Sequence, residues 1–133
     1  MGINNIEKVE GLDGRLYELV APLVMNPEVL RQNRNYPFKT SKRYLWFIAM
    51  EEGNVIGFLP VEIRDKQAII NNYYTKEENQ NILADLLRRG ISELEKDYFL
   101  VSVTQNQHIE TFLKQGFVIE REWKNYVRMR KTE

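Results

Sequence analysis

The chain has 133 residues, 43% of them hydrophobic, and its 19 basic residues balance 19 acidic ones. This length predicts one domain over residues 1–133, and the balanced charge gives no positive field that would gather nucleic acid. The lack of cysteine excludes disulfides and a thiolate nucleophile, and a single histidine argues against a metal site. No apolar run approaches the ~20 residues that span a bilayer and no leader-like segment occurs, so we expect a cytoplasmic protein that does not bind membranes.

The first third of the chain predicts a short strand and two helices. Residues 3–9 fit a strand. The apolar positions that follow recur at helical spacing and form one stripe: Leu16, Leu19, Val20, Leu23 and Val24. Asn26 followed by Pro27 is typical of a helix cap and first residue, so a second helix is expected through Gln32. Residues 34–43 then form a basic loop.

Three strands are expected next. Residues 44–50 and 55–63 are rich in β-forming residues and flank a compact polar turn, which predicts an antiparallel hairpin. A second turn at residues 64–67 leads to a third strand at residues 68–74, so the three strands form a meander. Pro60 indicates a bulge or an edge position in the middle strand.

The strongest helix is expected from about residue 78 to residue 96. Its apolar face has six members: Ile82, Leu83, Leu86, Leu87, Ile91 and Leu94. A buried type of strand follows at residues 98–103. Because a helix links this strand to the preceding one, we expect a parallel crossover.

The C-terminal part of the chain predicts a short helix and a last strand or hairpin. The helix is expected at about residues 107–114, where Gly116 ends it. Residues 117–123 and 126–129 supply the final strands. The whole order of elements predicts an α+β protein with a mixed sheet.

The turn before the long helix, at residues 79–81, has the position of an anion site. The first amides of a helix lack internal partners and the helix dipole is positive there, so such a turn can hold a phosphate. This turn contains no glycine, which phosphate-binding loops use to approach the anion, although Asn81 tolerates a left-handed conformation. A polar connection without a ligand explains these residues equally well.

The element order and the sequence Phe-Leu-Lys-Gln-Gly-Phe at residues 112–117 resemble the GNAT N-acetyltransferases over nearly the whole chain. The hexapeptide looks like that family's late signature, a helix that ends in Gly-Phe before the last strand. The resemblance implies a layered α/β/α fold with an antiparallel meander and a parallel crossover. It also implies transfer of an acetyl or acyl group from acetyl-CoA or another acyl-CoA to the amine of a small molecule or a protein.

The resemblance further implies where coenzyme A would bind. The family's pyrophosphate motif falls on Glu78, Asn81 and Leu83, and all three depart from its Gln/Arg and Gly/Ala pattern. A carboxylate at Glu78 repels a pyrophosphate, but it favours a ligand-free helix start. The other residues expected to contact the cofactor are in this turn, in the third meander strand and near the last helix: Asn79, Gln80, Ile82, Asn71, Asn72, Tyr73, Asn106 (or Gln105) and Phe112.

Asn71, Asn72 and Tyr73 fall where a strand of the family splays and offers backbone groups to the pantetheine arm. An asparagine side chain suits such a break, because it can satisfy groups released from the sheet. The same residues suit the end of an ordinary strand.

The candidate catalytic residues are a carboxylate and a phenol. Glu62 is our candidate base, because alternation along its strand places it away from its apolar neighbours, although a solvated strand glutamate has the same pattern. Phe112 occupies the position of the family's tyrosine acid and has no proton to give. Tyr73, Tyr74 or Tyr98 would have to replace it, unless these rings only pack in the core.

Other residues of interest are aromatic or basic. The single histidine, His108, is expected to cap a helix or lie at the surface, with a proton relay as the other interpretation. Trp46 is expected in the core and Trp123 partly exposed. The basic side chains of residues 31–43, interleaved with aromatic rings, indicate a solvated loop, or a loop that closes over an acidic or phosphorylated partner.

Two further interpretations stay open, and either allows a homodimer. The missing glycines, Glu78 and Phe112 favour a non-catalytic GNAT-fold module that binds a ligand or a protein. An unrelated α+β domain with the same element order is the other. An open gap between the strand ending near Tyr73 and residues 98–103 would support the enzyme. A gap filled by side chains, with Glu78 capping the long helix, would favour the module.

Overall fold

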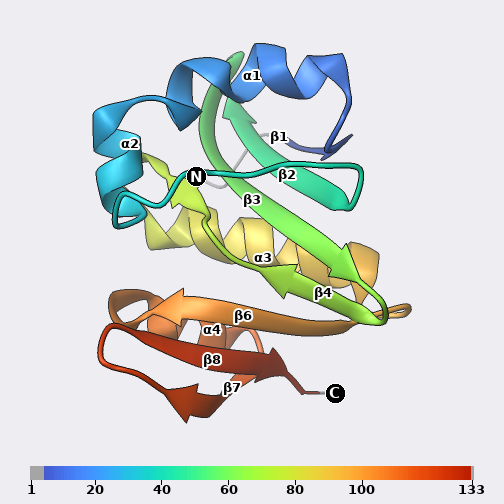
Figure 1. The fold of residues 1–133 in the computed structure, drawn as a ribbon, viewed down its shortest axis with the longest axis vertical. Helices are drawn as coiled ribbons and strands as arrows, with labels where there is room; N and C mark the ends of the chain where they lie inside the picture. Colours follow the sequence, from blue (N-terminus) through green and yellow to red (C-terminus); the bar gives the residue numbers. More distant parts are fainter. Residues whose placement is uncertain (1–4, 133) are drawn as a thin grey trace.

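The structure is a computed structural model that describes residues 5–132, and within them eight strands form one mixed sheet (Figure 1). The strands are β1 (Asn5–Glu10), β2 (Tyr44–Glu51), β3 (Asn54–Arg64), β4 (Gln67–Ile70), β5 (Tyr74–Thr75), β6 (Phe99–Gln105), β7 (Phe117–Glu122) and β8 (Tyr126–Lys131). Their order across the sheet is β1-β2-β3-β4-β6-β8-β7, and β5 pairs with β3. All neighbours are antiparallel except β4 and β6, which are parallel, as the crossover predicted.

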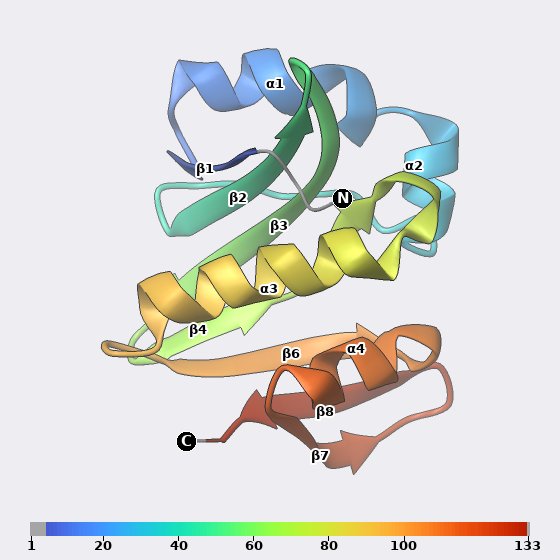
Figure 2. The same cartoon turned by 180° about the vertical axis from the view of Figure 1, so that it is seen from behind.

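Helices cover both faces of this sheet. They are α1 (Gly14–Val24), α2 (Pro27–Gln32), α3 (Gln80–Leu94) and α4 (Ile109–Lys114), with short 3₁₀ turns η1 (Lys76–Glu78) and η2 (Asn106–His108). α3 and α4 lie on the face that Figure 2 turns toward the viewer, while α1 and α2 pack at the β1–β3 end of the other face. Within residues 5–132, no helix is both long and apolar enough to cross a membrane.

Strand alternation divides the core into two clusters. Under α3 and α4 the cluster includes Phe47, Leu59 and Phe112, all fully buried. Under α1 and α2 it includes Trp46 and Phe58, whose ring centroids are 5.2 Å apart, so the expected core position of Trp46 is confirmed. Because neighbouring residues of one strand enter different clusters, this half of the sheet is buried on both sides.

The helix termini follow the local chemistry of the sequence. Asn26 caps α2 by accepting from the amide of Glu28 at 2.8 Å, with Pro27 as the first helical residue. Gly116 ends α4 with a φ of +96°, which glycine adopts without steric cost. The expected helix boundaries are therefore confirmed here.

The third strand of the meander differs from the expectation. β4 ends at Ile70, and the following strand β5 has only two residues. Between them Asn72 has a φ of 60°, which turns the chain out of the β4 ladder. The long helix also begins later than expected, at Gln80, because Glu77 and Glu78 have φ values of 55° and 51°. The first two residues of the expected first strand, 3 and 4, lie outside the described residues.

Candidate active site

A gap opens in the sheet where β4 and β6 stop pairing. Their parallel ladder runs from Gln67 opposite Phe99 to Ile70 opposite Ser102. Beyond that point β5 pairs with β3, while β6 continues along β8. Residues 71–75 and 103–105 therefore form the two sides of the gap, and the interpretation of residues 71–73 as a splayed strand is the one observed.

Backbone strain is concentrated around this gap. Of seven non-glycine residues with positive φ in the described part of the chain, five lie at its two mouths: Arg34, Asn35, Asn72, Glu77 and Glu78. A left-handed conformation costs roughly 1–2 kcal/mol for an ordinary residue. The other two, Glu52 and Asp65, occupy hairpin turns, where such conformations are common. Strain of this kind is typical of functional sites.

A glutamine from α2 bridges to the edge of β5. The Nε2 of Gln32 donates to the carbonyl oxygen of Thr75 at 2.9 Å, and the amide nitrogen of Thr75 donates to Oε1 of Gln32 at 3.2 Å. One side-chain carboxamide therefore takes both hydrogen bonds that a neighbouring strand would make. We expected an asparagine at residue 71 or 72 to satisfy the released backbone; Gln32 does so instead.

The bridge continues to the far side of the gap. Gln105, at the end of β6 and 4% exposed, donates from Nε2 to the carbonyl oxygen of Gln32 at 3.0 Å. Gln107 in turn donates to Oε1 of Gln105 at 2.9 Å. Side chains thus connect β5 to β6 at the place where the backbone ladder is missing.

A second connection across the gap is a chain of three titratable side chains, of which Tyr73 and His108 are buried and Glu78 is 48% exposed. The hydroxyl of Tyr73 lies 2.7 Å from Nδ1 of His108, and Nε2 of His108 lies 3.0 Å from Oε1 of Glu78. A carboxylate only accepts, so Nε2 carries the proton toward Glu78, and the Nδ1 of a neutral ring then accepts from the Tyr73 hydroxyl. His108 is 3% exposed, and although it is the N-cap residue of α4 its side chain makes no capping hydrogen bond, so the expectation of a capping or surface side chain is wrong.

Burial of Tyr73 raises the pKa of its phenol well above the ordinary value of 10.0. The centroid of its ring is 5.7 Å from that of Phe112, and the centroids of Phe112 and Phe117 are 5.3 Å apart. The phenol therefore lies on the α4 side of the sheet, beside the residue that lacks a hydroxyl. Tyr73 stays protonated at neutral pH.

The start of α3 is capped by a side chain. Oδ1 of Asn79 accepts from the amides of Asn81 at 2.9 Å and Ile82 at 3.2 Å. Capping by Glu78, the possibility raised above, is not observed, because the Glu78 carboxylate contacts His108. The hollow beside this helix start is lined by acidic and basic residues alike: Glu51, Glu77, Asp85, Lys76 and Arg88.

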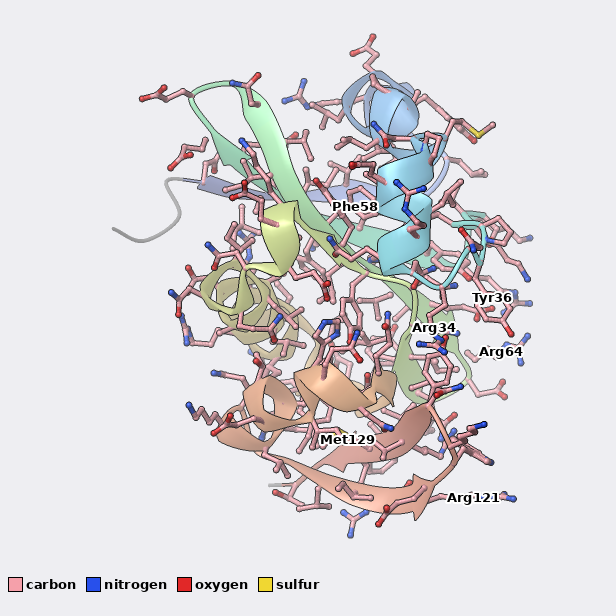
Figure 3. The ribbon with its side chains drawn as sticks, turned by 90° about the vertical axis from the view of Figure 1, so that its left-hand side faces the viewer. Arg34, Tyr36, Phe58, Arg64, Arg121 and Met129 are labelled. Atoms are coloured by element: carbon pink, nitrogen blue, oxygen red, sulfur yellow. The ribbon has the colours of Figure 1, made fainter. Side chains whose placement is uncertain are left out.

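The opposite face of the gap has a cavity of about 440 Å³, lined by Tyr36, Pro37, Lys39, Asn71, Asn72, Val103 and Tyr126. Val127 and Met129 belong to the core under α3 and α4, so their neighbour Tyr126 points to this other face. The Arg34 guanidinium lies 5.8 Å from the centroid of the Tyr126 ring. Figure 3 shows Arg34 and Tyr36 on the side of the molecule away from α3.

Comparison with known proteins finds matches in structure and none in sequence. No protein-family model and no curated protein sequence matches the chain. An acyl-CoA N-acyltransferase from Pseudomonas aeruginosa matches in structure over 96% of this chain and 99% of its own, with a TM-score of 0.75 and 17% identity. The PaiA N-acetyltransferase from Thermoplasma acidophilum, in complex with coenzyme A, matches over 100% of both chains, with a TM-score of 0.66 and 18% identity.

A GNAT family acetyltransferase from Elizabethkingia anophelis with acetyl-CoA bound matches over 95% of this chain and 94% of its own, with a TM-score of 0.59 and 20% identity. The chain has the GNAT fold. The layered architecture and mixed sheet expected from the element order are therefore confirmed.

The gap fits one part of an acyl-CoA ligand and not another. Thr75 already pairs with a carboxamide, so its backbone fits the amide groups of a pantetheine arm if Gln32 moves away. The start of α3 does not fit a diphosphate as it stands. Asn79 occupies two of its amides, and Glu77 and Glu78 add negative charge beside them.

The other expected cofactor residues of the GNAT fold are scattered. Gln80 accepts from the Thr111 hydroxyl at 2.6 Å and so ties α3 to α4. Leu83 is fully buried in the core rather than at the mouth. Asn106 donates to the carbonyl oxygen of Lys124 at 2.9 Å. Within residues 5–132, no group of three or more acidic, histidine or cysteine side chains is placed to hold a metal ion.

The candidate catalytic residues separate in space. Glu62 lies on β3 opposite Ile69 of β4, two residues before the gap begins at Asn71. Its carboxylate pairs with Nε of Arg64 at 3.3 Å. Tyr98 precedes β6 at the end where β4 and β6 are still paired, so the structure places it away from the gap. Of the four candidates, Tyr73, Tyr74 and Glu62 are near the gap, and the ring of Tyr74 packs against Phe58 in the cluster under α1 and α2.

Sequence reasoning missed Gln32, and it named Gln105 and His108 without foreseeing their contacts with Gln32 and with Tyr73. Gln32 is the last residue of a helix of six, and nothing in its local pattern distinguishes it. The position of His108 did carry a signal. It lies four residues before Phe112, and residues four apart share one face of a helix, so His108 could have been predicted to be buried beside that ring.

Proposed function

We propose that this chain is an acyl-CoA-dependent N-acyltransferase that transfers an acetyl or other acyl group to a primary amine. The observation that supports this proposal is the pairing of the Thr75 backbone with a side-chain carboxamide at the gap. A strand edge that accepts and donates to one amide has the hydrogen bonds that a pantetheine arm requires. In this proposal Gln32 holds the edge until the donor arrives.

The proposed chemistry is a direct transfer, because a chain without cysteine has no thiol to form an acyl intermediate. Acyl-CoA supplies a thioester, whose carbon–sulfur bond breaks as the nitrogen–carbon bond forms. Glu62 takes the proton of the attacking amine through a water molecule. Its carboxylate is held by Nε of Arg64 at 3.3 Å.

In the free protein the single hydroxyl proton of Tyr73 is donated to Nδ1 of His108. In this proposal the proton turns from His108 to the leaving sulfur, on the α4 side, when acyl-CoA is bound. The raised pKa of its phenol makes complete proton transfer to a thiolate unfavourable, so its contribution is stabilisation of developing charge. His108 and Glu78 hold the hydroxyl in position. This arrangement would compensate for the missing hydroxyl at Phe112.

A second candidate function is a GNAT-fold module that has lost catalysis. The specific observation in its favour is that the polar groups at the start of α3 and at β5 already have partners within the chain, namely Asn79 and Gln32. Glu77 and Glu78 add charge that opposes a diphosphate. In this case the gap is a closed structural feature.

Calorimetric titration with acetyl-CoA and with free coenzyme A distinguishes the two candidates. The Asn81→Trp variant, which blocks the exposed start of α3, is the control. Micromolar binding that this variant loses supports the acyltransferase. A folded protein that binds neither compound at millimolar concentration overturns it. If acetyl-CoA binds, amines are added and the release of coenzyme A is measured with a thiol reagent. Because the chain has no cysteine, the reagent detects only the thiol of coenzyme A.

A further inference from the structure

The cavity on the face away from α3 has a distinct chemistry. Two phenol rings, a proline and a valine form most of its wall, from Tyr36, Tyr126, Pro37 and Val103. Such a wall suits a flat apolar or aromatic body, because tyrosine offers a large apolar area with a polar tip. The amides of Asn71 and Asn72 supply hydrogen-bonding groups at the mouth of the gap.

The charge at this cavity is positive. Of the described residues that line it, Lys39 alone is charged. The guanidinium of Arg34 lies above the Tyr126 ring at the rim. The next cation along β8, Arg128, is opposite Val103 but is already paired with Glu120 at 3.4 Å. Lys39 and Arg34 are therefore the cations available to a ligand in the cavity.

The loop that carries these cations is held in place by hydrogen bonds. Arg34 and Asn35 have φ values of 54° and 65°, and the amide of Asn35 donates to the carbonyl oxygen of Leu30 at 2.7 Å. Asn33, only 4% exposed, donates from Nδ2 to the carbonyl oxygen of Tyr36 at 3.1 Å. The strained turn thus directs Arg34 and Tyr36 toward the cavity at a cost in stability.

We infer that the acceptor is an amine that carries a carboxylate beside an apolar or aromatic body, as an α-amino acid does. Lys39 and Arg34 bind the carboxylate, the rings of Tyr36 and Tyr126 enclose the body, and the amino group faces Asn71 and Asn72 at the gap. This inference rests on the proposed function for its catalytic meaning, but the binding chemistry is independent of the acyl donor.

Binding of matched pairs tests the inference. Each aromatic or aliphatic α-amino acid is compared with its own carboxamide, which keeps the amine and the body but lacks the anion. We expect at least one acid to bind about fivefold to tenfold more tightly than its carboxamide, because a charge-assisted hydrogen bond is lost. A panel in which no acid is preferred overturns the inference.

Two variants identify the cations. Lys39→Gln and Arg34→Gln should each reduce the preference for the acid at least threefold, whereas Lys42→Gln, in the same loop but outside the cavity lining, should leave it unchanged. An equal loss in Lys42→Gln overturns the assignment. Ligand-observed nuclear magnetic resonance without acyl donor measures this binding, so failure of acetyl-CoA binding would count against the proposed function and not against this inference.

Discussion

Gln32 and Thr75, which are 43 residues apart, are joined by two hydrogen bonds between one side chain and one backbone unit. A strand edge inside a sheet normally exposes its groups to another strand, to a ligand or to water. Here the carboxamide of Gln32 has the chemistry of a peptide group and takes the place of a strand. This bridge determines whether anything else can pair with β5.

Replacing Gln32 with alanine should uncover this edge. Two hydrogen bonds of about 1 kcal/mol each are lost, so we expect the free energy of unfolding to fall by roughly 1–2 kcal/mol. Affinity for acetyl-CoA should rise about tenfold, because the ligand no longer competes with the side chain. Urea unfolding and calorimetry measure the two effects. Arg31→Ala, on the same helix with an exposed side chain, is the control, and equal affinities in both variants would contradict the bridge.

Removing the hydroxyl of Tyr73 should destabilise the protein at neutral pH. In Tyr73→Phe, Nδ1 of the buried His108 loses its partner, which costs about 1–3 kcal/mol. Since the folded pKa of Tyr73 is raised above 10.0, its contribution is full below pH 10 and is lost as the pH rises further. The difference in the free energy of unfolding between Tyr73→Phe and the original protein should therefore become smaller above pH 10. Urea unfolding from pH 7 to pH 11 tests this, with Tyr17→Phe, at an exposed tyrosine, as the control; a difference that grows with pH would contradict it.

The acidic mouth at α3 should weaken binding of a diphosphate. Glu77→Gln removes one charge beside the helix start, and we expect acetyl-CoA affinity to rise roughly threefold to fivefold, on the order of 1 kcal/mol. The gain should disappear in high salt. Asp65→Asn is a matched control, because Asp65 also has a left-handed φ, of 53°, but lies in the β3–β4 turn. Calorimetry at two salt concentrations decides the matter; a gain that persists in high salt would refute a charge effect.

Two buried glycines should respond in opposite ways to alanine. A Cβ at Gly57 would lie 3.0 Å from the carbonyl oxygen of Tyr74 and 3.1 Å from Cγ2 of Ile82, so Gly57→Ala should lose about 1–3 kcal/mol of stability. A Cβ at Gly90 has its nearest neighbour at 3.5 Å, and α3 should gain up to about 1 kcal/mol from the better helix former. Thermal unfolding compares them, and a stable Gly57→Ala would show that α3 is not pressed against β3.

The sequence predicted those parts of the fold that local chemistry determines. Asn26 and Pro27 define the start of α2, and the apolar spacing from Ile82 to Leu94 defines α3, because capping and helical periodicity act within a few residues. The splay near Tyr73 was foreseen through the family resemblance and not through periodicity. Its cause, the positive φ of Asn72, leaves no clear signature in a single sequence.

The candidate site was harder to predict because its contacts are long-range. Tyr73 and His108 are 35 residues apart, and Glu78 and His108 are 30 apart. Whether such side chains meet depends on the β4–β6 register and on where α4 packs, which no local pattern contains. The residues themselves looked ordinary: a strand tyrosine, a turn glutamate and a histidine at a helix start.

The short β4–β6 ladder also has a mechanical meaning. Its four paired positions, from Gln67 to Ile70, are the backbone seam by which β1–β4 meet β6–β8 in the described sheet. Beyond this seam the two halves are joined by side chains: the Gln32 bridge, the contact of Tyr73 with His108, and the core under α3 and α4, which has members on both sides. A ligand that enters the gap therefore has to displace side chains, but it breaks no backbone hydrogen bond of the β4–β6 ladder.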